Sequence, residues 1–177
     1  MIDLTSTFLP NTVSVGGRNY SIYTDFRLWM KFEIEVSKMK RGESINIGYL
    51  FKNEMPARCD LRELFAFSRP LSPLPRSNSH SNVTAFDYEI DADYIYSAFM
   101  SQYGIDLIDV KLHWHKFLAL FKGLKEDEMI CKIMAYRCYE KSDTNKDVYE
   151  ELKHEWAIER LADDEQAELD KFSSIFD

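Results

Sequence analysis

Long hydrophobic runs are missing from this sequence, and no stretch approaches the roughly 18–20 consecutive apolar residues that span a bilayer. Met1 leads into a mixed polar segment without a basic stretch before it, so no export signal is expected. Cysteine is scarce as well: Cys59, Cys131 and Cys138 are an odd number without CxxC spacing, which argues against a disulfide framework or a zinc ribbon. These absences favour a protein of a reducing cytoplasm with no membrane partner.

Motifs for catalysis and phosphate binding are also missing. The sequence contains no GxxxxGK[ST] loop, no GxGxxG turn and no GxSxG elbow. His113 and His115 suggest a metal site, but residues two apart on a helix diverge by roughly 200°, whereas ligands on one face are three or four residues apart. We therefore expect no enzyme, no catalytic residues, no cofactor and no metal.

Positive charge is not in excess either. Residues 140–177 hold 13 acidic and five basic residues, so this acidic end alone accounts for the net charge of −8. Binding to nucleic acid depends on Lys and Arg side chains that neutralise phosphates, and the charge distribution therefore predicts no nucleic acid partner. The acidic end fits either a solvated helix face that keeps the protein in solution or a surface that docks onto a basic partner.

The sequence does contain ample core material, since 45% of its 177 residues are hydrophobic and 14% are aromatic. This length suits one domain or two small ones. Three prolines and a Ser/Asn-rich run predict that residues 69–85 are a linker or loop. We expect an N-terminal region, 1–68, with a hairpin and helices, and a C-terminal helical region, 86–177, with the acidic end.

A β-hairpin is predicted near the N-terminus. Alternating apolar residues lie on both sides of Gly16 and Gly17 within the segment 12–23. Paired glycines supply the positive φ that a tight hairpin turn needs, and the flanking alternation is typical of short strands.

The segment 25–36 has an ambiguous pattern. Its apolar residues alternate as in a strand, yet Leu28, Phe32 and Val36 also share one helix face beside Trp29, and Thr24 is a residue type that caps helices. We interpret the segment as a helix, a choice that the family resemblance described below also favours.

Helical patterns predominate in the rest of the chain, where apolar residues recur at helical spacing. The predicted helices cover 58–67, 92–103 with Gly104 as C-cap, a segment through Trp114, Phe117 and Phe121 with Asp109 as N-cap, 126–139 and 146–161, with 163–176 as an extension. Short connections predict that neighbouring helices pack antiparallel. The expected fold is mainly α, a helical bundle-like arrangement with a small N-terminal β-hairpin.

The residues 86–140, with the runs DYIYSAF, QYGIDL and LHWHKF, closely resemble a family of small proteins encoded in the tail gene clusters of Gram-positive siphophages and prophages. A weaker match covers 20–29. This family is regarded as tail assembly chaperones. The family-motif positions, expected in the core or at a protein interface, are Asp25, Phe26, Arg27, Tyr94, Phe99, Tyr103, His113, Trp114, Phe117, Tyr136 and Arg137.

The resemblance implies a non-catalytic bacteriophage protein of the host bacterial cytoplasm that is absent from the mature virion. It would form a homo-oligomer and bind the tape measure protein, with the major tail protein as a second candidate partner. One alternative is a structural virion component, such as a tail connector or completion protein. Another is a small acidic regulator of a host protein.

Overall fold

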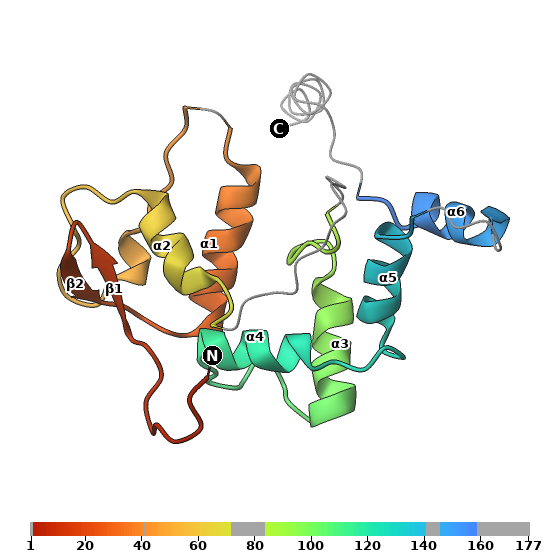
Figure 1. Ribbon diagram of the computed structural model, residues 1–177, viewed down its shortest axis with the longest axis horizontal. Coiled ribbons are helices and arrows are strands. Elements are labelled where there is room, and N and C mark those ends of the chain that lie inside the picture. The colour runs from red at the N-terminus through yellow and green to blue at the C-terminus, as the bar shows by residue number, and fades with distance from the viewer. Residues whose placement is uncertain (1, 41, 72–83, 141–145, 159–177) are drawn as a thin grey trace, which may run out of the picture.

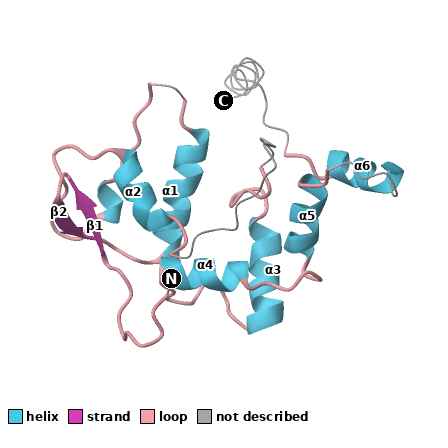
Figure 2. Cartoon of the chain, in the orientation of Figure 1, coloured by secondary structure: helices cyan, strands magenta, loops and turns pink. Residues whose placement is uncertain are grey.

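The computed structural model describes residues 2–40, 42–71, 84–140 and 146–158. Helices predominate among these residues, and a two-stranded hairpin lies near the N-terminus (Figure 1, Figure 2). In chain order the elements are β1 (Thr12–Val15), β2 (Arg18–Ser21), α1 (Phe26–Lys38), the short 3-10 helix η1 (Gly48–Leu50), α2 (Leu61–Ser68), α3 (Ala92–Tyr103), α4 (Trp114–Lys122), α5 (Met129–Arg137) and α6 (Lys146–Glu155). The predicted mainly α fold with a small N-terminal hairpin is confirmed.

The hairpin forms where the paired glycines predict it, with β1 and β2 antiparallel. Gly16 and Gly17 have φ of 56° and 80°, and positive φ at both central residues is what a type I′ turn requires. Val13 and Val15 are buried in the core. The Gly16 N–H donates to the Glu63 carboxylate at 2.9 Å, so α2 holds the hairpin turn in place.

Helix α1 forms where the sequence also allowed a strand. Its N-cap is Asp25 and not the expected Thr24, because the Asp25 carboxylate accepts the Arg27 N–H at 3.0 Å. The Thr24 carbonyl oxygen instead accepts the Trp114 N–H at 2.8 Å. A contact with a distant segment therefore decides where the helix begins.

The buried face of α1 also differs from the expected one. Phe26, Trp29 and Phe32 are buried, whereas Leu28 and Val36 are half-buried. The expected face was therefore right for Phe32 and the neighbouring Trp29. Residues three apart face the core because they share one side of a helix as well as residues four apart do.

Local signals decide the ends of α2 and α3. Helix α2 begins at residue 61 and not at 58, because Asp60 and Glu63 form a capping box at its start. Helix α3 has the predicted bounds. Gly104 follows it with a φ of 63°, and its N–H donates to the Met100 carbonyl oxygen at 3.0 Å, as expected for a left-handed C-cap.

Helix α4 differs from its prediction in both its start and its direction. Its N-cap is His113, whose ring accepts the His115 N–H at 3.1 Å, and not Asp109. Figure 1 shows α4 lying crosswise to α1 and α3, so the expected antiparallel packing of neighbours is wrong for this helix. The loop between α3 and α4 lies against α1, and the chain changes direction there before α4 begins.

The last two described helices are shorter than expected. Helix α5 occupies the middle of the predicted 126–139, and α6 ends at Glu155 and not at 161. The predicted extension 163–176 and most of the predicted linker, residues 72–83, lie outside the described residues.

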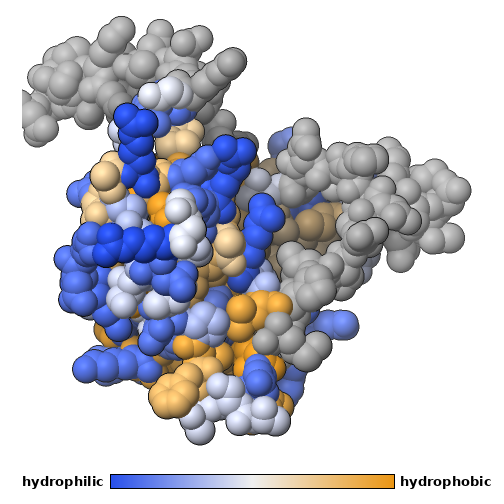
Figure 3. Space-filling model, turned by 60° about the vertical axis from the view of Figure 1, so that its left-hand side comes forward, coloured by the Kyte–Doolittle hydropathy of each residue, from blue (hydrophilic) through white to orange (hydrophobic). Residues whose placement is uncertain are grey.

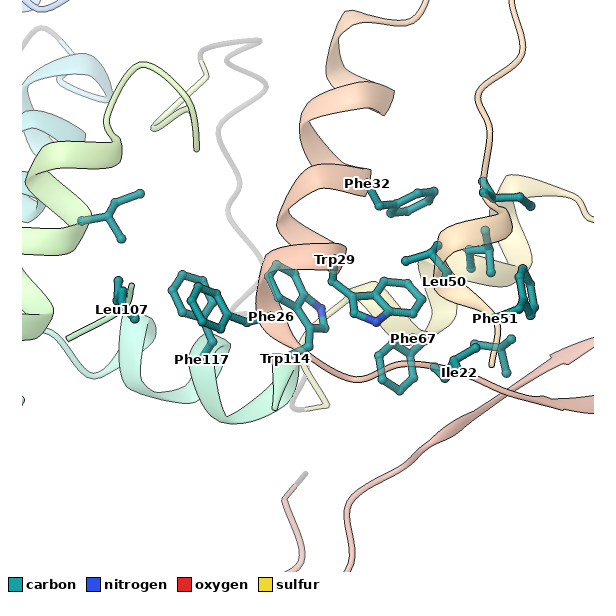
Figure 4. Close-up of a cluster of buried hydrophobic side chains, with 14 of the residues drawn as sticks. Ile22, Phe26, Trp29, Phe32, Leu50, Phe51, Phe67, Leu107, Trp114 and Phe117 are labelled. Carbon is teal, nitrogen blue, oxygen red and sulfur yellow. The ribbon is translucent and has the colours of Figure 1, made fainter. Parts of the chain in front are cut away.

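One hydrophobic cluster contains buried residues from both predicted regions. Figure 4 shows its side chains in a row that runs from Leu107 past Phe117 and Phe26 to Trp29 and Phe51. The rings of Phe26 and Phe117 are stacked with centroids 5.0 Å apart. The two regions therefore share one core, and α4 provides the contact between them.

Candidate protein-binding surface

Two segments far apart in the sequence meet where α1 and α4 begin. The Phe26 N–H donates to the Leu112 carbonyl oxygen at 3.0 Å, and the Trp114 N–H donates to the Thr24 carbonyl oxygen at 2.8 Å. These bonds form an isolated antiparallel bridge. The bridge places the motif positions Asp25 and Phe26 beside His113 and Trp114.

Arg27 ties the loop between α3 and α4 to α1. Its Nη1 donates to the Asp25 carboxylate at 3.1 Å. Its Nη2 lies 3.0 Å from the carbonyl oxygen of Leu107, 2.5 Å from that of Ile108 and 2.9 Å from that of Val110. A guanidinium carries five N–H donors in a rigid fork, so one side chain can satisfy several carbonyl groups at a chain turn. Arg27 therefore fixes the position of this loop.

The two histidines lie closer than expected, with ring centroids 5.3 Å apart, because His113 is an extended N-cap and not a helical residue. His113 accepts the His115 N–H at Nδ1, and its Nε2 lies 2.9 Å from the Pro10 carbonyl oxygen. His115 places Nε2 2.8 Å from the Phe67 carbonyl oxygen, and its buried Nδ1 has no hydrogen-bond partner among the described residues. Burial lowers the pKa of both rings. Neutral rings that donate from Nε2 satisfy this arrangement.

Phe117 occupies the centre of the aromatic cluster. Its ring is stacked on Phe26 at 5.0 Å, Phe99 at 5.1 Å, Trp114 at 5.6 Å and Phe121 at 6.0 Å between centroids. Aromatic pairs of this kind contribute roughly 0.5–1.5 kcal/mol beyond the burial of their area. The motif positions Phe26, Phe99, Trp114 and Phe117 therefore belong to the core.

Arg137 makes a buried ion pair with Asp91. Its Nη1 lies 2.6 Å from Oδ2 and its Nη2 lies 3.0 Å from Oδ1. Nη1 also lies 3.2 Å from the Ala85 carbonyl oxygen, and Nε lies 2.6 Å from the Trp156 carbonyl oxygen. The carboxylate of Asp91, the residue before α3, neutralises this guanidinium.

Three motif tyrosines join neighbouring helices. Tyr94 of α3 packs edge to face on Trp156 at 5.7 Å, and Tyr136 of α5 packs edge to face on Tyr149 of α6 at 6.2 Å. The Tyr103 hydroxyl donates to a carbonyl oxygen of α4 at 2.9 Å. All eleven motif positions are buried or half-buried, so they lie in the core or at the contacts between elements.

Two apolar hollows flank the segment that precedes α3. The first, the α4–α5 hollow, has a volume of about 520 Å³, and the residues that line it include Glu33, Phe86, Tyr88, Trp114, Phe121 and Met134. The second, the α1–α3 hollow, has a volume of about 580 Å³, and the residues that line it include Phe26, Arg27, Met30, Tyr88, Tyr96 and Ile108. Tyr88 lines both hollows. Sequence reasoning identified neither, because each is built from several elements.

A carboxyl group lies at the wall of the α4–α5 hollow. Burial raises the pKa of Glu33, while a hydrogen bond from Ser68 and the charge of Arg69 act in the opposite direction. Tyr88 is also affected, because burial and the nearby charge of Glu33 raise the pKa of its phenol. The hollow thus combines apolar walls with one partly buried carboxyl group, a combination typical of binding sites.

The family model described as Bacteriophage Gp15 protein matches residues 37–158 of the chain, well over half of its length. The chain belongs to the bacteriophage Gp15 protein family. No curated protein and no solved structure was found to match it. The Gp15 match begins at the end of α1 and includes α2 to α6. It therefore covers the α4–α5 hollow almost entirely.

The Gp15 match includes eight of the eleven motif positions and leaves Asp25, Phe26 and Arg27 before its start. Among the described residues, no group of three or more His, Cys, Asp or Glu side chains could hold a metal ion. In the same part of the chain, no helix is long and apolar enough to cross a membrane.

Proposed function

We propose that this Gp15 family protein is a tail assembly chaperone that acts without catalysis in the host bacterial cytoplasm. In this proposal it self-associates and covers apolar helical segments of the tape measure protein until the tail tube forms around them. Membership of a bacteriophage family and the family resemblance of residues 86–140 support the proposal. The reversible covering of an apolar helix requires an apolar groove and no chemical step.

The observation that carries the proposal is the α1–α3 hollow and the apolar side chains around it. Ile108 lines the hollow and is 73% exposed, and Ile90, which precedes the lining residues Ala92 and Asp93 in the chain, is 55% exposed. Large apolar side chains at this exposure lose their contact with water when a partner helix covers them. The hollow and its isoleucine therefore suit one face of an amphipathic helix.

Arg27 contributes to this surface by holding the loop that carries Ile108. Its guanidinium binds the Ile108 carbonyl oxygen at 2.5 Å and lines the same hollow, so the loop that carries Ile108 is held in one position. A side chain on a fixed loop loses less conformational freedom on binding than one on a loose loop. The motif position Arg27 thus assists partner binding through the loop.

The test is co-expression with the neighbouring tape measure gene. This chain is then captured in a pull-down, and the amount of tape measure protein recovered with it is measured. Ile108→Asp should reduce recovery of the tape measure protein at least tenfold, because the partner would have to cover a charge. Val148→Asp is the matched control, since Val148 is 65% exposed on α6, which contributes no residue to the lining of the hollow. Its recovery should equal that of the wild type.

Failure of the wild-type chain to recover the tape measure protein would refute the chaperone function. Equal recovery by the Ile108 and Val148 variants would leave the function standing but would place the binding surface elsewhere.

A further inference from the structure

One wall of the α1–α3 hollow is acidic. Seven of the ten described residues that line this hollow belong to the segment 84–113, which consists of α3 and the chain on both sides of it. The segment contains six acidic residues and one basic residue, Lys111, although residues 1–139 taken together are neutral. The excess of acid is therefore local to this wall, and the charge of the whole region conceals it.

Two of the six acids are neutralised by bases from other helices. Arg137 of α5 binds Asp91, and Lys38 at the end of α1 pairs with Glu89. A third carboxylate, that of Asp87, accepts two backbone N–H groups of the turn before α3 at 2.8 and 3.1 Å. These three acids therefore serve the fold.

The other three acids, Asp93, Asp106 and Asp109, border the hollow. Asp93 lines it directly, and Tyr96, another lining residue, lies close to the other two. Burial, the charge of Asp106 and a hydrogen bond to it, and the charge of Asp109 together raise the pKa of the Tyr96 phenol. None of the three acids forms an ion pair within the part of the chain that the structure describes.

Arg27 also lines the hollow, but it does not cancel these charges. Its guanidinium is paired with the Asp25 carboxylate at 3.1 Å, and its other donors bind carbonyl oxygens of the loop before α4. An apolar surface bordered by carboxylates without ion-pair partners favours a ligand that brings apolar side chains together with positive charge.

The other two apolar hollows differ in charge and in cover. The α4–α5 hollow mixes Glu33 with Arg69 and Lys122 in its lining. An adjoining hollow of about 390 Å³ is lined by Lys122 and by Ile2 and Leu4, so the chain's own N-terminal segment covers part of it. Apolar side chains gather low on the face in Figure 3, at the level where Figure 1 places that segment. The α1–α3 hollow alone among the three combines a strongly exposed lining isoleucine with an acidic border.

We infer that the helix which covers the α1–α3 hollow carries lysine or arginine beside its apolar face. Its apolar side chains cover Ile108 and the lining, while its basic side chains meet Asp93 and Asp109 at the border. The inference rests on the proposed function, in which the bound segment of the tape measure protein is then a basic amphipathic helix.

The same charges disfavour the chain's own acidic end as the occupant. Residues 140–177 hold 13 acids and five bases, so this end would bring like charge to the border of the hollow. Like charges that face each other across an interface oppose binding and select among partners of similar hydrophobicity. A second copy that docks through α6 is disfavoured for the same reason, because α6 has twice as many acidic as basic residues.

The carboxylates are expected to select the partner more than to supply its affinity. An exposed ion pair changes an affinity by only about 1.4- to 5-fold, and apolar burial provides the rest. An acidic helix of equal hydrophobicity loses these pairs and meets repulsion instead, so the difference between the two helices is larger than either effect alone.

Fluorescence anisotropy of two synthetic peptides with the full chain provides the first test. Both peptides have the same leucine stripe at helical spacing, and the positions beside the stripe are lysine in one and glutamate in the other. At low salt the chain should bind the lysine peptide at least tenfold more tightly. Ile108→Ser should weaken that binding several-fold, because Ile108 lines the hollow. Equal affinities for the two peptides, or no binding of the lysine peptide, would overturn the inference.

Charge reversal identifies the carboxylates that are responsible. The double variant Asp93→Lys, Asp109→Lys should prefer the glutamate peptide, and Asp109→Lys alone, outside the helices, should at least reduce the preference for lysine. The matched control is Glu151→Lys with Glu155→Lys, an equal change of charge at exposed positions of α6, which contributes no lining residue. This control should keep the wild-type preference. A control that behaves as the double variant does would assign the preference to net charge and overturn the inference.

Failure of this inference and failure of the proposed function give different results. Among overlapping fragments of the tape measure protein, the chain should capture those with lysine or arginine beside an apolar helix face. Capture of fragments without such bases would overturn the inference and keep the chaperone function. Selective binding of the lysine peptide by a chain that recovers no tape measure protein would support the inferred class of helix and remove the chaperone function.

Discussion

Arg137 at the end of α5 donates two hydrogen bonds, of 2.6 and 3.0 Å, to Asp91 at the start of α3, and both side chains are almost fully buried. The same guanidinium binds the Trp156 carbonyl oxygen beyond α6 at 2.6 Å. One side chain thus holds the ends of three helices together. A bidentate guanidinium suits this position because its fork fits the carboxylate and leaves Nε free for another carbonyl.

Arg137→Met should lower the free energy of unfolding by about 3–5 kcal/mol, because it leaves the Asp91 carboxylate buried without its partner. The matched control is Arg18→Met at the exposed pair with Glu54, which should cost less than about 1 kcal/mol. Urea unfolding of both variants measures the difference. In the Asp91→Leu, Arg137→Met double variant the loss should be smaller than the sum of the single losses. An additive double variant would show that the pair is not coupled.

Trp114→Ala should lower the free energy of unfolding by about 3–5 kcal/mol, as expected for a truncated large aromatic residue. Trp114 is fully buried, its ring is stacked on Phe117, and its Nε1 donates to the Ser68 carbonyl oxygen at 2.7 Å. Trp114→Phe keeps an aromatic ring and loses the donor, so it should cost about 1–3 kcal/mol. Denaturation midpoints equal to that of the wild type would mean that the ring contributes nothing to the core.

The sequence predicts an element well where the deciding signal lies within a few residues. Gly16 and Gly17 fix the hairpin turn and Gly104 fixes the end of α3, because glycine adopts positive φ without strain. Asp60 and Glu63 also fix the start of α2 through bonds to each other's backbone, a local signal that the expected start at residue 58 overlooked. These features need no distant partner.

Prediction from sequence fails where a distant contact decides. Thr24 lost its role as N-cap because its carbonyl binds Trp114, and Asp109 lost the same role to His113 because the loop before α4 is tied to α1 by Arg27. These contacts join residues about 80–90 positions apart, which local spacing does not reveal. The hollows were not predicted for the same reason.

The pair of Asp91 and Arg137 was predictable in part. Arg137 shares a helix face with Ile130 and Ile133, and an arginine on an apolar face requires a buried acid. The sequence offers Asp87, Glu89, Asp91 and Asp93 as candidates in one short run. Choosing Asp91 requires the relative position of α3 and α5, which spacing within either helix does not supply.

Stability should fall as the pH is lowered below about 6.5, the ordinary pKa of histidine. Burial lowers the pKa of His113 and His115 in the folded chain, so the unfolded chain binds more protons in this range and protonation favours unfolding. His115→Gln keeps an amide donor for the Phe67 carbonyl oxygen and cannot be protonated, so it should flatten the fall. Thermal unfolding midpoints of both chains, taken between neutral and mildly acidic pH, measure this loss of stability.

The control for this pH effect is His154→Gln, since His154 is exposed on α6 and should leave the pH profile unchanged. Glu33 acts in the opposite sense near its ordinary pKa of 4.5, because a raised pKa lets the folded chain bind the proton more tightly. A profile of His115→Gln that matches the wild type would assign the loss of stability to other groups.

Trp156→Ala should loosen α6 selectively. Its ring packs on Tyr94, and α6 otherwise contacts the body through pairs such as Tyr149 with Tyr139 and the Lys153 bond to the Tyr139 carbonyl oxygen. Amide exchange in α6 should become several-fold faster, while exchange in α1 stays unchanged. His154→Ala at the neighbouring exposed position should have no such effect. Uniformly faster exchange would mean that α6 unfolds together with the rest of the chain.

Salt should weaken the complex with the tape measure protein by no more than a few fold. The α1–α3 hollow and Ile108 offer apolar area, and its burial is not screened by ions as charge pairing is. A complex held by the acidic end would respond differently, because residues 140–177 carry the whole net charge and many exposed pairs would be screened together.

A chain that lacks residues 163–177 should therefore bind within a few fold of the full chain, with the same salt dependence, while its solubility falls. Isothermal titration of the full and the shortened chain at low and high salt measures the affinity and its salt dependence. Binding abolished by moderate salt would keep the partner and replace the apolar contact with an electrostatic one.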